Sequence, residues 1–182
     1  KCLRQNSGGA LVDLGIINDQ GVQIHYAGPY QLKNANYGQT TWFKDMRNQS
    51  AYISDVFHGF RDFPHFIVAV SGQWAGSTWF LKATVDFDKF NSLVENTRIG
   101  ETGWAFILNR KGEFQTKTHT KPDVDREPYV RFLNSEGVTD NNDTVVVHSE
   151  SMGAGQIRVM SRLKGGDWVL AFEQDEPEAY TG

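Results

Sequence analysis

A four-residue turn that occurs twice decides the fold: residues 18–21 read Asn-Asp-Gln-Gly, and residues 109–112 read Asn-Arg-Lys-Gly, 91 positions later. Each turn lies between two strand-like segments, which are residues 11–17 and 22–26 in the first half and residues 103–108 and 113–118 in the second. Glycine adopts positive φ angles without a steric penalty, so the glycine of each turn suits a tight β-hairpin. The chain therefore begins the same hairpin twice.

The closing strands of the two halves also match, because Trp79 and Trp168 open them 89 positions apart. Matching offsets at both ends predict two homologous modules, which we place at residues 1–98 and 99–182. The remaining apolar spacing predicts helical segments at residues 37–48, from Asp86 onward and at 128–134, and strands at 65–70, 78–85, 144–149, 156–163 and 168–174. Each half reads as an antiparallel sheet with its helices on one side, which is an α+β fold.

Composition and charge exclude several classes of protein. The chain has 182 residues, of which 39% are hydrophobic and 13% aromatic, so it has enough apolar mass to build a core and is not globally disordered. Its net charge of -4 provides no basic field for phosphate backbones, which argues against a nucleic-acid partner. The longest apolar runs, such as Trp104–Leu108, are far too short to cross a bilayer.

Motifs for catalysis or metal binding are missing from the sequence. It has no GxSxG elbow, no Walker loop, no dinucleotide fingerprint and no HExxH pair. Cys2 is the single cysteine, which excludes an internal disulfide and any two-cysteine metal motif. Asp140–Asp143 resembles a calcium loop only in composition, because it lacks the central glycine and the distant glutamate. We therefore predict no catalytic residue, no metal site and no cofactor.

Five stretches of the sequence together resemble the double Cache domain, the tandem PAS-like extracytoplasmic sensor of bacterial transmembrane receptors. They are Trp42-Phe43, Tyr52–Phe57, Pro64–Val70, Trp79–Phe87 and Gly103–Gly112. The sequence of residues 50–70 is most similar to the sensor portions of histidine kinases. The resemblance implies two PAS-like modules on a long N-terminal helix, with a small molecule bound in the first, membrane-distal module.

The resemblance also implies where the chain resides and how it assembles. A sensor cut from between two membrane spans would begin without a targeting signal, as this chain does at Lys1, and most of its N-terminal helix would lie upstream. We therefore expect a periplasmic or extracellular part of a membrane protein. In the full receptor we expect a homodimer, and the parent protein, rather than this part of it, would be the kinase.

Amino-acid-binding members of the family hold the ligand carboxylate with a Tyr, an Arg and a Trp-Tyr pair, and its ammonium with an Asp on the next strand. Here Trp42 and Phe43 match the aromatic pair. The Arg position is occupied by Thr40, which cannot form a bidentate bond to a carboxylate. The family Tyr position is Ala35, although two tyrosines lie close by in the sequence.

Asp55 fits the position of the acidic residue, with Tyr52 three residues before it. An aspartate among aromatic rings suits an amine or quaternary ammonium. We therefore expect a small cationic or zwitterionic metabolite, or a polar organic molecule, held by Tyr30, Tyr37, Trp42, Phe43, Tyr52, Asp55 and His65. The alternatives are that Asp55 is a strand-end cap or surface charge, and that the aromatic pair is plain core packing.

The second module is expected to hold no ligand, because Pro128-Tyr129 takes the place of the aromatic pair there. Other outputs remain open, since the same modules serve chemoreceptors and cyclic-dinucleotide enzymes. A second class of function is a periplasmic interaction module without a small ligand. It predicts an exposed apolar patch and a closed cavity in the first module.

Overall fold

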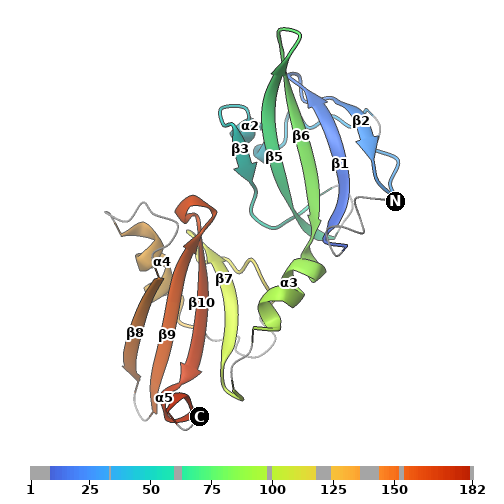
Figure 1. The fold of residues 1–182 in the computed structure, drawn as a ribbon. Coiled ribbons are helices and arrows are strands. Elements are labelled where there is room, and N and C mark those ends of the chain that lie inside the picture. The colour runs from blue at the N-terminus through green and yellow to red at the C-terminus, as the bar shows by residue number, and fades with distance from the viewer. Residues whose placement is uncertain are drawn as a thin grey trace. The chain divides into compact units, whose positions relative to one another are not determined.

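The computed structural model describes residues 9–32, 34–59, 63–97, 100–117, 124–135, 144–151 and 154–180. The chain divides into two compact units, Lys1–Phe90 (unit 1) and Asn91–Gly182 (unit 2), which are treated separately below (Figure 1). Cys2, the expected N-terminal helix and Asp140–Asp143 lie outside the described residues. Within the described part of the chain, no helix has both the length and the apolar character needed to cross a membrane.

Unit 1 is built on an antiparallel sheet with strand order β2-β1-β6-β5-β3, in which β4 also pairs with β5. Its strands are β1 (Leu11–Asn18), β2 (Gln23–Ala27), β3 (Ala51–Ile53), β4 (Phe57–His58), β5 (Pro64–Trp74) and β6 (Ser77–Asp86). Helix α2 (Thr41–Met46) follows β2, and α3 (Phe87–Glu95) follows β6. Strands β5 and β6 form a long hairpin that extends beyond the other strands of the unit (Figure 1).

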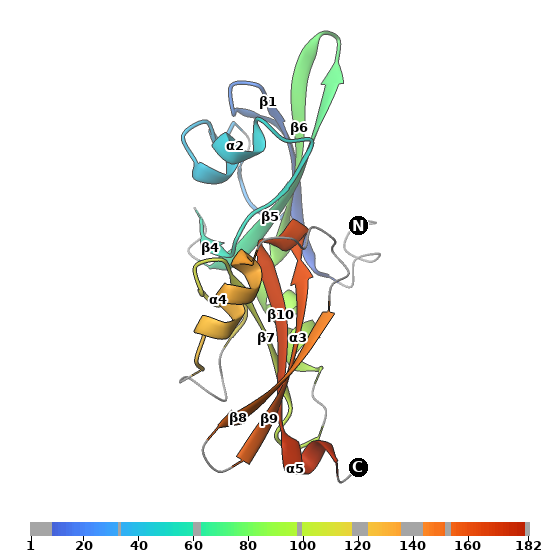
Figure 2. The ribbon, with the colours of Figure 1, turned by 90° about the vertical axis from the view of Figure 1, so that its left-hand side faces the viewer.

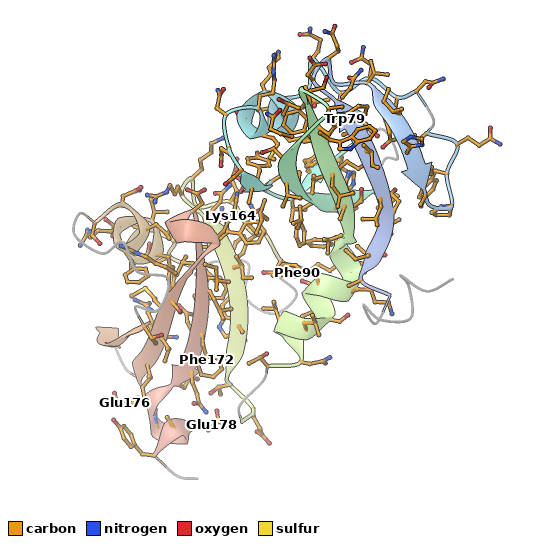
Figure 3. The ribbon with its side chains drawn as sticks, turned by 45° about the horizontal axis from the view of Figure 1, so that its top comes forward. Trp79, Phe90, Lys164, Phe172, Glu176 and Glu178 are labelled. Atoms are coloured by element: carbon orange, nitrogen blue, oxygen red, sulfur yellow. The ribbon has the colours of Figure 1, made fainter. Side chains whose placement is uncertain are left out.

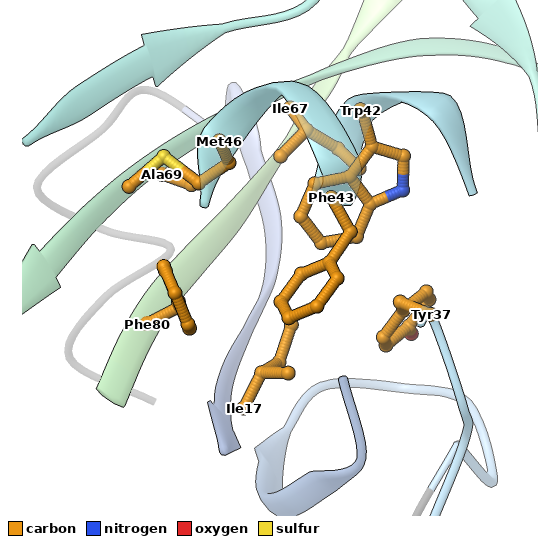
Figure 4. Packing of buried hydrophobic residues seen from close by; sticks show 8 residues of the cluster. All are labelled: Ile17, Tyr37, Trp42, Phe43, Met46, Ile67, Ala69 and Phe80. Carbon is orange, nitrogen blue, oxygen red and sulfur yellow. The ribbon is translucent and has the colours of Figure 1, made fainter. Parts of the chain in front are cut away.

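Helix α2 covers one face of this sheet, called the inner face below (Figure 2). Successive strand residues point to opposite faces, so every second residue of β1, β5 and β6 points inward. The core consists of buried apolar side chains from α2, from the loop before it and from the inner face, namely Ile17, Tyr37, Trp42, Phe43, Met46, Ile67, Ala69 and Phe80 (Figure 4). Burial of α2 against the sheet therefore makes this short helix stable despite its six residues.

Unit 2 repeats this plan with a four-stranded antiparallel sheet in the order β7-β10-β9-β8. Its strands are β7 (Trp104–Asn109), β8 (Thr144–Ser151), β9 (Ala154–Leu163) and β10 (Trp168–Asp175), and its helices are α4 (Glu127–Asn134) and α5 (Glu176–Ala179). A 3-10 turn, Lys164–Gly166, joins β9 to β10. Helix α4 lies on one face of the sheet and contributes Tyr129 and Leu133 to the core (Figure 2).

The repeated turn has the same hydrogen bonds in both units. Asn18 Oδ1 accepts from the backbone of Gln20 and Val22 at 3.1 and 2.8 Å, and Asn109 Oδ1 accepts from the corresponding Lys111 and Glu113 at 3.0 and 2.9 Å. The turn glycines have φ angles of 86° and 76°. On the neighbouring strand, Asn18 is paired with Trp79, and Asn109 is paired with Trp168. The turn asparagine and its paired tryptophan therefore define which residues of the two sheets correspond to one another.

The fold class predicted from the sequence, α+β with antiparallel sheets, is confirmed. Two elements differ in detail. The helical segment expected over residues 37–48 is helical only from Thr41 to Met46. Within the described residues 113–117, the expected strand is reduced to a single bridge between Phe114 and Leu108, because the Thr116 hydroxyl accepts the hydrogen bond from Ile107 N that a strand carbonyl would otherwise accept.

Candidate functional site

Three of the predicted ligand residues, Tyr37, Trp42 and Phe43, lie in the core between α2 and the sheet of unit 1 (Figure 4). Their rings pack in sequence, with centroids 5.3 Å apart for Tyr37 and Trp42 and 5.7 Å apart for Trp42 and Phe43. Thr40, at the position of the family Arg, donates its hydroxyl to the Tyr37 carbonyl at 2.7 Å. The rings of Tyr37, Trp42 and Phe43 therefore form an apolar layer that covers the inner face of the sheet.

Tyr52 and Asp55 lie along the segment that follows α2. The Tyr52 hydroxyl donates to the Asp45 carboxylate of α2 at 3.3 Å, and part of the ring packs against the core. Asp55 is half-buried between β3 and β4, and its backbone carbonyl accepts from the Ser54 hydroxyl at 2.8 Å.

His65 and Tyr30 come together around Phe63. The His65 ring is buried, lies 4.6 Å from the ring of Phe57 and 5.5 Å from that of Phe63, and its Nδ1 is 2.9 Å from the Phe63 carbonyl. Tyr30 is exposed, and its ring centroid is 6.2 Å from that of Phe63. The structure thus divides most of the predicted set between the α2 core and this aromatic group.

A buried charge pair that the sequence reasoning missed lies on the same inner face. Asp13 of β1 and Lys82 of β6 are 4% and 2% exposed, and Lys82 Nζ is 3.4 Å from Asp13 Oδ1. The Thr84 hydroxyl donates to the same carboxylate oxygen at 2.8 Å, and the Tyr26 hydroxyl donates to Oδ2 at 3.2 Å. We call these four residues the polar cluster; its Lys82 ammonium also lies over the Tyr37 ring, 5.0 Å from the centroid.

The register of the sheet explains why these groups meet. Asp13 is paired with Thr84 across β1 and β6. The next pair that points to the same face, two residues further along, is Gly15 with Lys82. Gly15 has no side chain, so the inner face has room there for the Gln23 side chain, whose Oε1 lies 2.1 Å from the place a Gly15 Cβ would take. The sequence carries one signal for this arrangement: each of two apolar alternating strands has a charged residue at an inward position.

An open hollow of about 560 Å³ lies at the edge of the sheet beside the polar cluster. We call it the edge hollow; it is lined by Ile24, His25, Tyr26, Tyr30, Gln31 and Leu32. Two residues of this lining contact buried polar groups. The Tyr26 hydroxyl donates to the Asp13 carboxylate, and the backbone carbonyl of Leu32 accepts from Gln23 Nε2 at 2.5 Å. Tyr26 therefore belongs both to the lining of the edge hollow and to the polar cluster.

The corresponding face of unit 2 is filled by aromatic side chains. Trp104 and Phe106 occupy the β7 positions that match Asp13 and Gly15, and their rings stack at 4.5 Å. The Tyr129 ring meets the Phe106 ring edge-on at 5.2 Å. Ala171, opposite Phe106, takes the place that Lys82 holds in unit 1.

Unit 2 also has buried polar groups on this face, among them the carboxylate of Glu173. The fully buried Tyr129 hydroxyl donates to Glu173 Oε1, and Arg158 Nε donates to the same oxygen at 3.2 Å. Burial, followed by the nearby negative charge of Glu173, raises the pKa of Tyr129 well above its ordinary value. Tyr129 is therefore a neutral hydrogen-bond donor inside a packed core.

No group of three histidine, cysteine, aspartate or glutamate side chains in the described part of the chain is placed to hold a metal ion. No protein-family model matches the sequence. No curated protein matches it either.

Solved structures with the same fold include extracellular ligand-binding domains of receptors and of putative histidine kinases. An extracellular ligand-binding receptor from Desulfohalobium retbaense superposes with a TM-score of 0.68 at 11% identity over 92% of this chain, which spans 31% of that receptor. The extracellular domain of the putative histidine kinase mmHK1S-Z2 gives 0.68 at 13% identity, covering 95% of this chain and 78% of that domain.

A chemoreceptor domain has the same fold. The ligand-binding domain of Campylobacter jejuni Tlp3, solved with 4-methylisoleucine, gives a TM-score of 0.66 at 8% identity, covering 98% of this chain and 70% of that domain. Together these similarities show that the chain has the fold of extracellular sensor domains, as the resemblance in its sequence predicts.

Proposed function

We propose that this chain, which has the fold of extracellular sensor domains, is the periplasmic or extracellular small-molecule-sensing part of a bacterial transmembrane receptor. The parent protein would most resemble a sensor histidine kinase, and the chain itself would carry no catalytic residue. Unit 1 is the ligand-binding, membrane-distal module, and unit 2 is the membrane-proximal module. The full receptor would be anchored by flanking helices and act as a homodimer.

The observation that carries this proposal is the polar cluster on the inner face of unit 1. Removing two charges from water is expensive, and a well-packed apolar pair is often as stable as a buried ion pair. Unit 2 has Trp104 and Ala171 at the positions that match Asp13 and Lys82, and its own charge pair, Arg158–Glu173, lies elsewhere on this face, so the fold does not require charges at these two positions. Charges kept at such a place favour a role in binding a polar ligand.

The ligand would be a small zwitterion, amine or other polar organic molecule held between the polar cluster and the predicted aromatic residues. Lys82 provides the cation that Thr40 cannot provide, and Asp13 or Asp55 provides the carboxylate for an ammonium group. Tyr37, Trp42 and Phe43 form the apolar wall, while Tyr30, Tyr52 and His65 lie toward the rim. Ligand changes the output only if it binds one conformation of the receptor better than the other.

A thermal-shift screen of amino acids, amines, carboxylates, polyols and nucleosides, followed by calorimetry, tests this function. A ligand at about 100 times its Kd stabilises the folded chain by about 2.7 kcal/mol, a readily measured rise in Tm. Lys82→Met should abolish that rise, and Asp55→Ala should reduce it if Asp55 holds an ammonium. Tyr129→Phe is the matched control in unit 2 and should leave the affinity unchanged.

Two results would contradict the proposal. One is a screen in which no compound raises the Tm. The other is a ligand whose binding is lost in Tyr129→Phe but retained in Lys82→Met, because that result would move the site to unit 2.

A second candidate, a protein-interaction module, is favoured by one surface. Ile16, Leu81 and Val70 form an exposed apolar row across β1, β6 and β5, on the face opposite α2. Trp74, at the end of the β5–β6 hairpin, is 73% exposed, and its ring centroid lies 6.4 Å from that of Trp79. Figure 3 labels Trp79. Contiguous exposed apolar surface of this kind is typical of protein-interaction sites. Capture of a partner protein that is lost in Leu81→Lys, together with a negative ligand screen, would favour this candidate.

A further inference from the structure

Gln23 presents a buried acceptor that no described group satisfies. Its side chain is fully buried, and Nε2 donates to the Leu32 carbonyl at 2.5 Å. This bond fixes the orientation of the amide, because exchanging its N and O atoms would place two acceptors against each other. Among the described residues, Oε1 then has no hydrogen-bond partner.

The backbone of Gln23 is fully engaged, so its side chain is held in place. Gln23 N donates to the Ala35 carbonyl at 2.9 Å, and its own carbonyl accepts from Asn34 N at 3.1 Å. An unsatisfied acceptor at such a buried position is rare in proteins and requires an explanation, such as a functional role or a bound water or ion.

The position of Oε1 points to the polar cluster. It lies directly over Gly15, whose partners in the sheet are Lys82 on β6 and Tyr26 on β2. Two members of the cluster therefore flank the glycine that the Gln23 amide covers. The Gln23 side chain also bonds Leu32, a wall of the edge hollow.

The charges of the polar cluster already balance. Asp13 and Lys82 form one buried pair with no net charge. A ligand with a net charge would add an uncompensated ion to this buried place, at a large desolvation cost. A ligand whose own charges sum to zero avoids that cost.

We infer that the ligand of this site has no net charge and donates an N–H or O–H hydrogen bond to Gln23 Oε1, which makes Gln23 the residue that selects for a donor. This inference rests on the proposed function and specifies the chemistry of the same site. It assigns a role to a residue that the sequence motifs do not mark.

Matched derivatives of glycine, L-alanine and L-leucine separate the two requirements. In each series the parent is a zwitterion with N–H donors, the N,N,N-trimethyl derivative is a zwitterion with none, the amide is a cation and the N-acetyl derivative is an anion. Calorimetry on the whole chain should show that at least one parent binds, that its trimethyl derivative binds at least tenfold more weakly, and that the amide and acetyl derivatives do not bind.

Gln23 variants locate the source of that discrimination. In Gln23→Met the affinity ratio between the parent and its trimethyl derivative should fall to about one. Because the ratio is measured within one variant, a partial loss of folding cancels. Gln73→Met, a change of the same kind at the exposed end of the β5–β6 hairpin, should leave the ratio unchanged.

The outcomes distinguish this inference from the function on which it rests. Equal affinity for a parent and its trimethyl derivative, preference for the amide or acetyl compounds, discrimination retained in Gln23→Met, or no binding in any series would overturn the inference. If a ligand from the wider screen still depends on Lys82, the proposed function stands. If no compound in the wider screen binds, both fail.

Discussion

Gly15 in unit 1 and Phe106 in unit 2 occupy the same place, three residues before the repeated turn and on the face that the helix covers. The glycine lies opposite a buried lysine, and the phenylalanine lies opposite an alanine. One framework thus supports a buried Asp13–Lys82 pair in unit 1 and stacked aromatic rings at the corresponding β7 positions in unit 2. The comparison teaches that neither the sheet nor its turn determines whether the inner face carries a charge pair: the inward residues on two adjacent strands do.

The largest expected effect comes from breaking the charge pair of unit 1. Asp13→Ala leaves the buried Lys82 ammonium without this carboxylate, and loss of one partner from a buried pair costs about 3–5 kcal/mol. In the double variant Asp13→Ala/Lys82→Met most of the loss should be recovered, because the uncompensated charge is gone. Denaturant unfolding of the three chains measures both free energies.

Phe106→Ala in unit 2 is the matched control for that rescue. It should also lose about 3–5 kcal/mol, in this case from the cavity left by a fully buried ring, and Lys82→Met should recover none of it. If the Asp13→Ala loss is equally resistant to rescue, the pair is not the source of the cost, and the electrostatic contrast between the two units is wrong.

A smaller effect, and one that depends on pH, is expected in the core of unit 2. Tyr129→Phe removes the hydroxyl that donates to Glu173 and should cost about 1–3 kcal/mol near neutral pH. The pKa of Tyr129 is raised in the folded chain, so this contribution is fully present below the unfolded pKa of about 10 and is lost progressively as the pH rises above it.

The measurement is the difference in unfolding free energy between the wild type and Tyr129→Phe from pH 7 to 11. That difference should shrink above pH 10, which separates Tyr129 from the other tyrosines because they titrate in both chains. A difference that stays constant over this range would contradict a neutral, buried Tyr129 donor.

The sequence predicted the repeated framework because the chemistry of its turn is local. Asn18 and Asn109 accept hydrogen bonds from backbone groups only two and four residues away, so a segment of five residues contains all of these contacts. The segment after the second turn could not be predicted in the same way. There the Thr116 side chain takes the place of a strand carbonyl, which alternation of residue types does not reveal.

The polar cluster was beyond sequence reasoning for a different reason. Asp13 and Lys82 lie 69 positions apart, and they meet only because β1 pairs with β6 in one particular register. The predicted aromatic residues Tyr37, Trp42 and Phe43 were found from a local motif, and they do lie together. The charged pair that lies next to these rings, however, is brought there by the topology of the sheet.

The smallest expected effect concerns two glycines that precede the first strand of each unit, β1 and β7. Gly9 and Gly100 are 91 positions apart and have φ angles of 82° and 71°. A Cβ on Gly9 would meet nothing within 4 Å, whereas a Cβ on Gly100 would lie 2.3 Å from Glu178 Oε1. Glu178 and Glu176 belong to α5, near the C-terminal end of the described chain (Figure 3).

Glu178 connects α5 by hydrogen bonds to the segment that precedes β7. Its carboxylate accepts from the Thr102 hydroxyl and from the backbone N–H groups of Glu101 and Thr102, and these bonds lower its pKa to about 2. The stabilisation they supply is therefore fully present above the ordinary pKa of a glutamate and is lost as the pH falls through about 2.

Gly9→Ala and Gly100→Ala form a matched pair that isolates this contact. Both variants place a Cβ in a left-handed conformation, at a cost of about 1–2 kcal/mol, but only Gly100→Ala displaces the Glu178 carboxylate. A carboxyl-carbon NMR titration should place the Glu178 pKa near 2 in the wild type and in Gly9→Ala, and should return it toward the ordinary value in Gly100→Ala. An unchanged midpoint in Gly100→Ala would mean that the carboxylate does not depend on the space above this glycine, and that the glycines before β1 and β7 are equivalent.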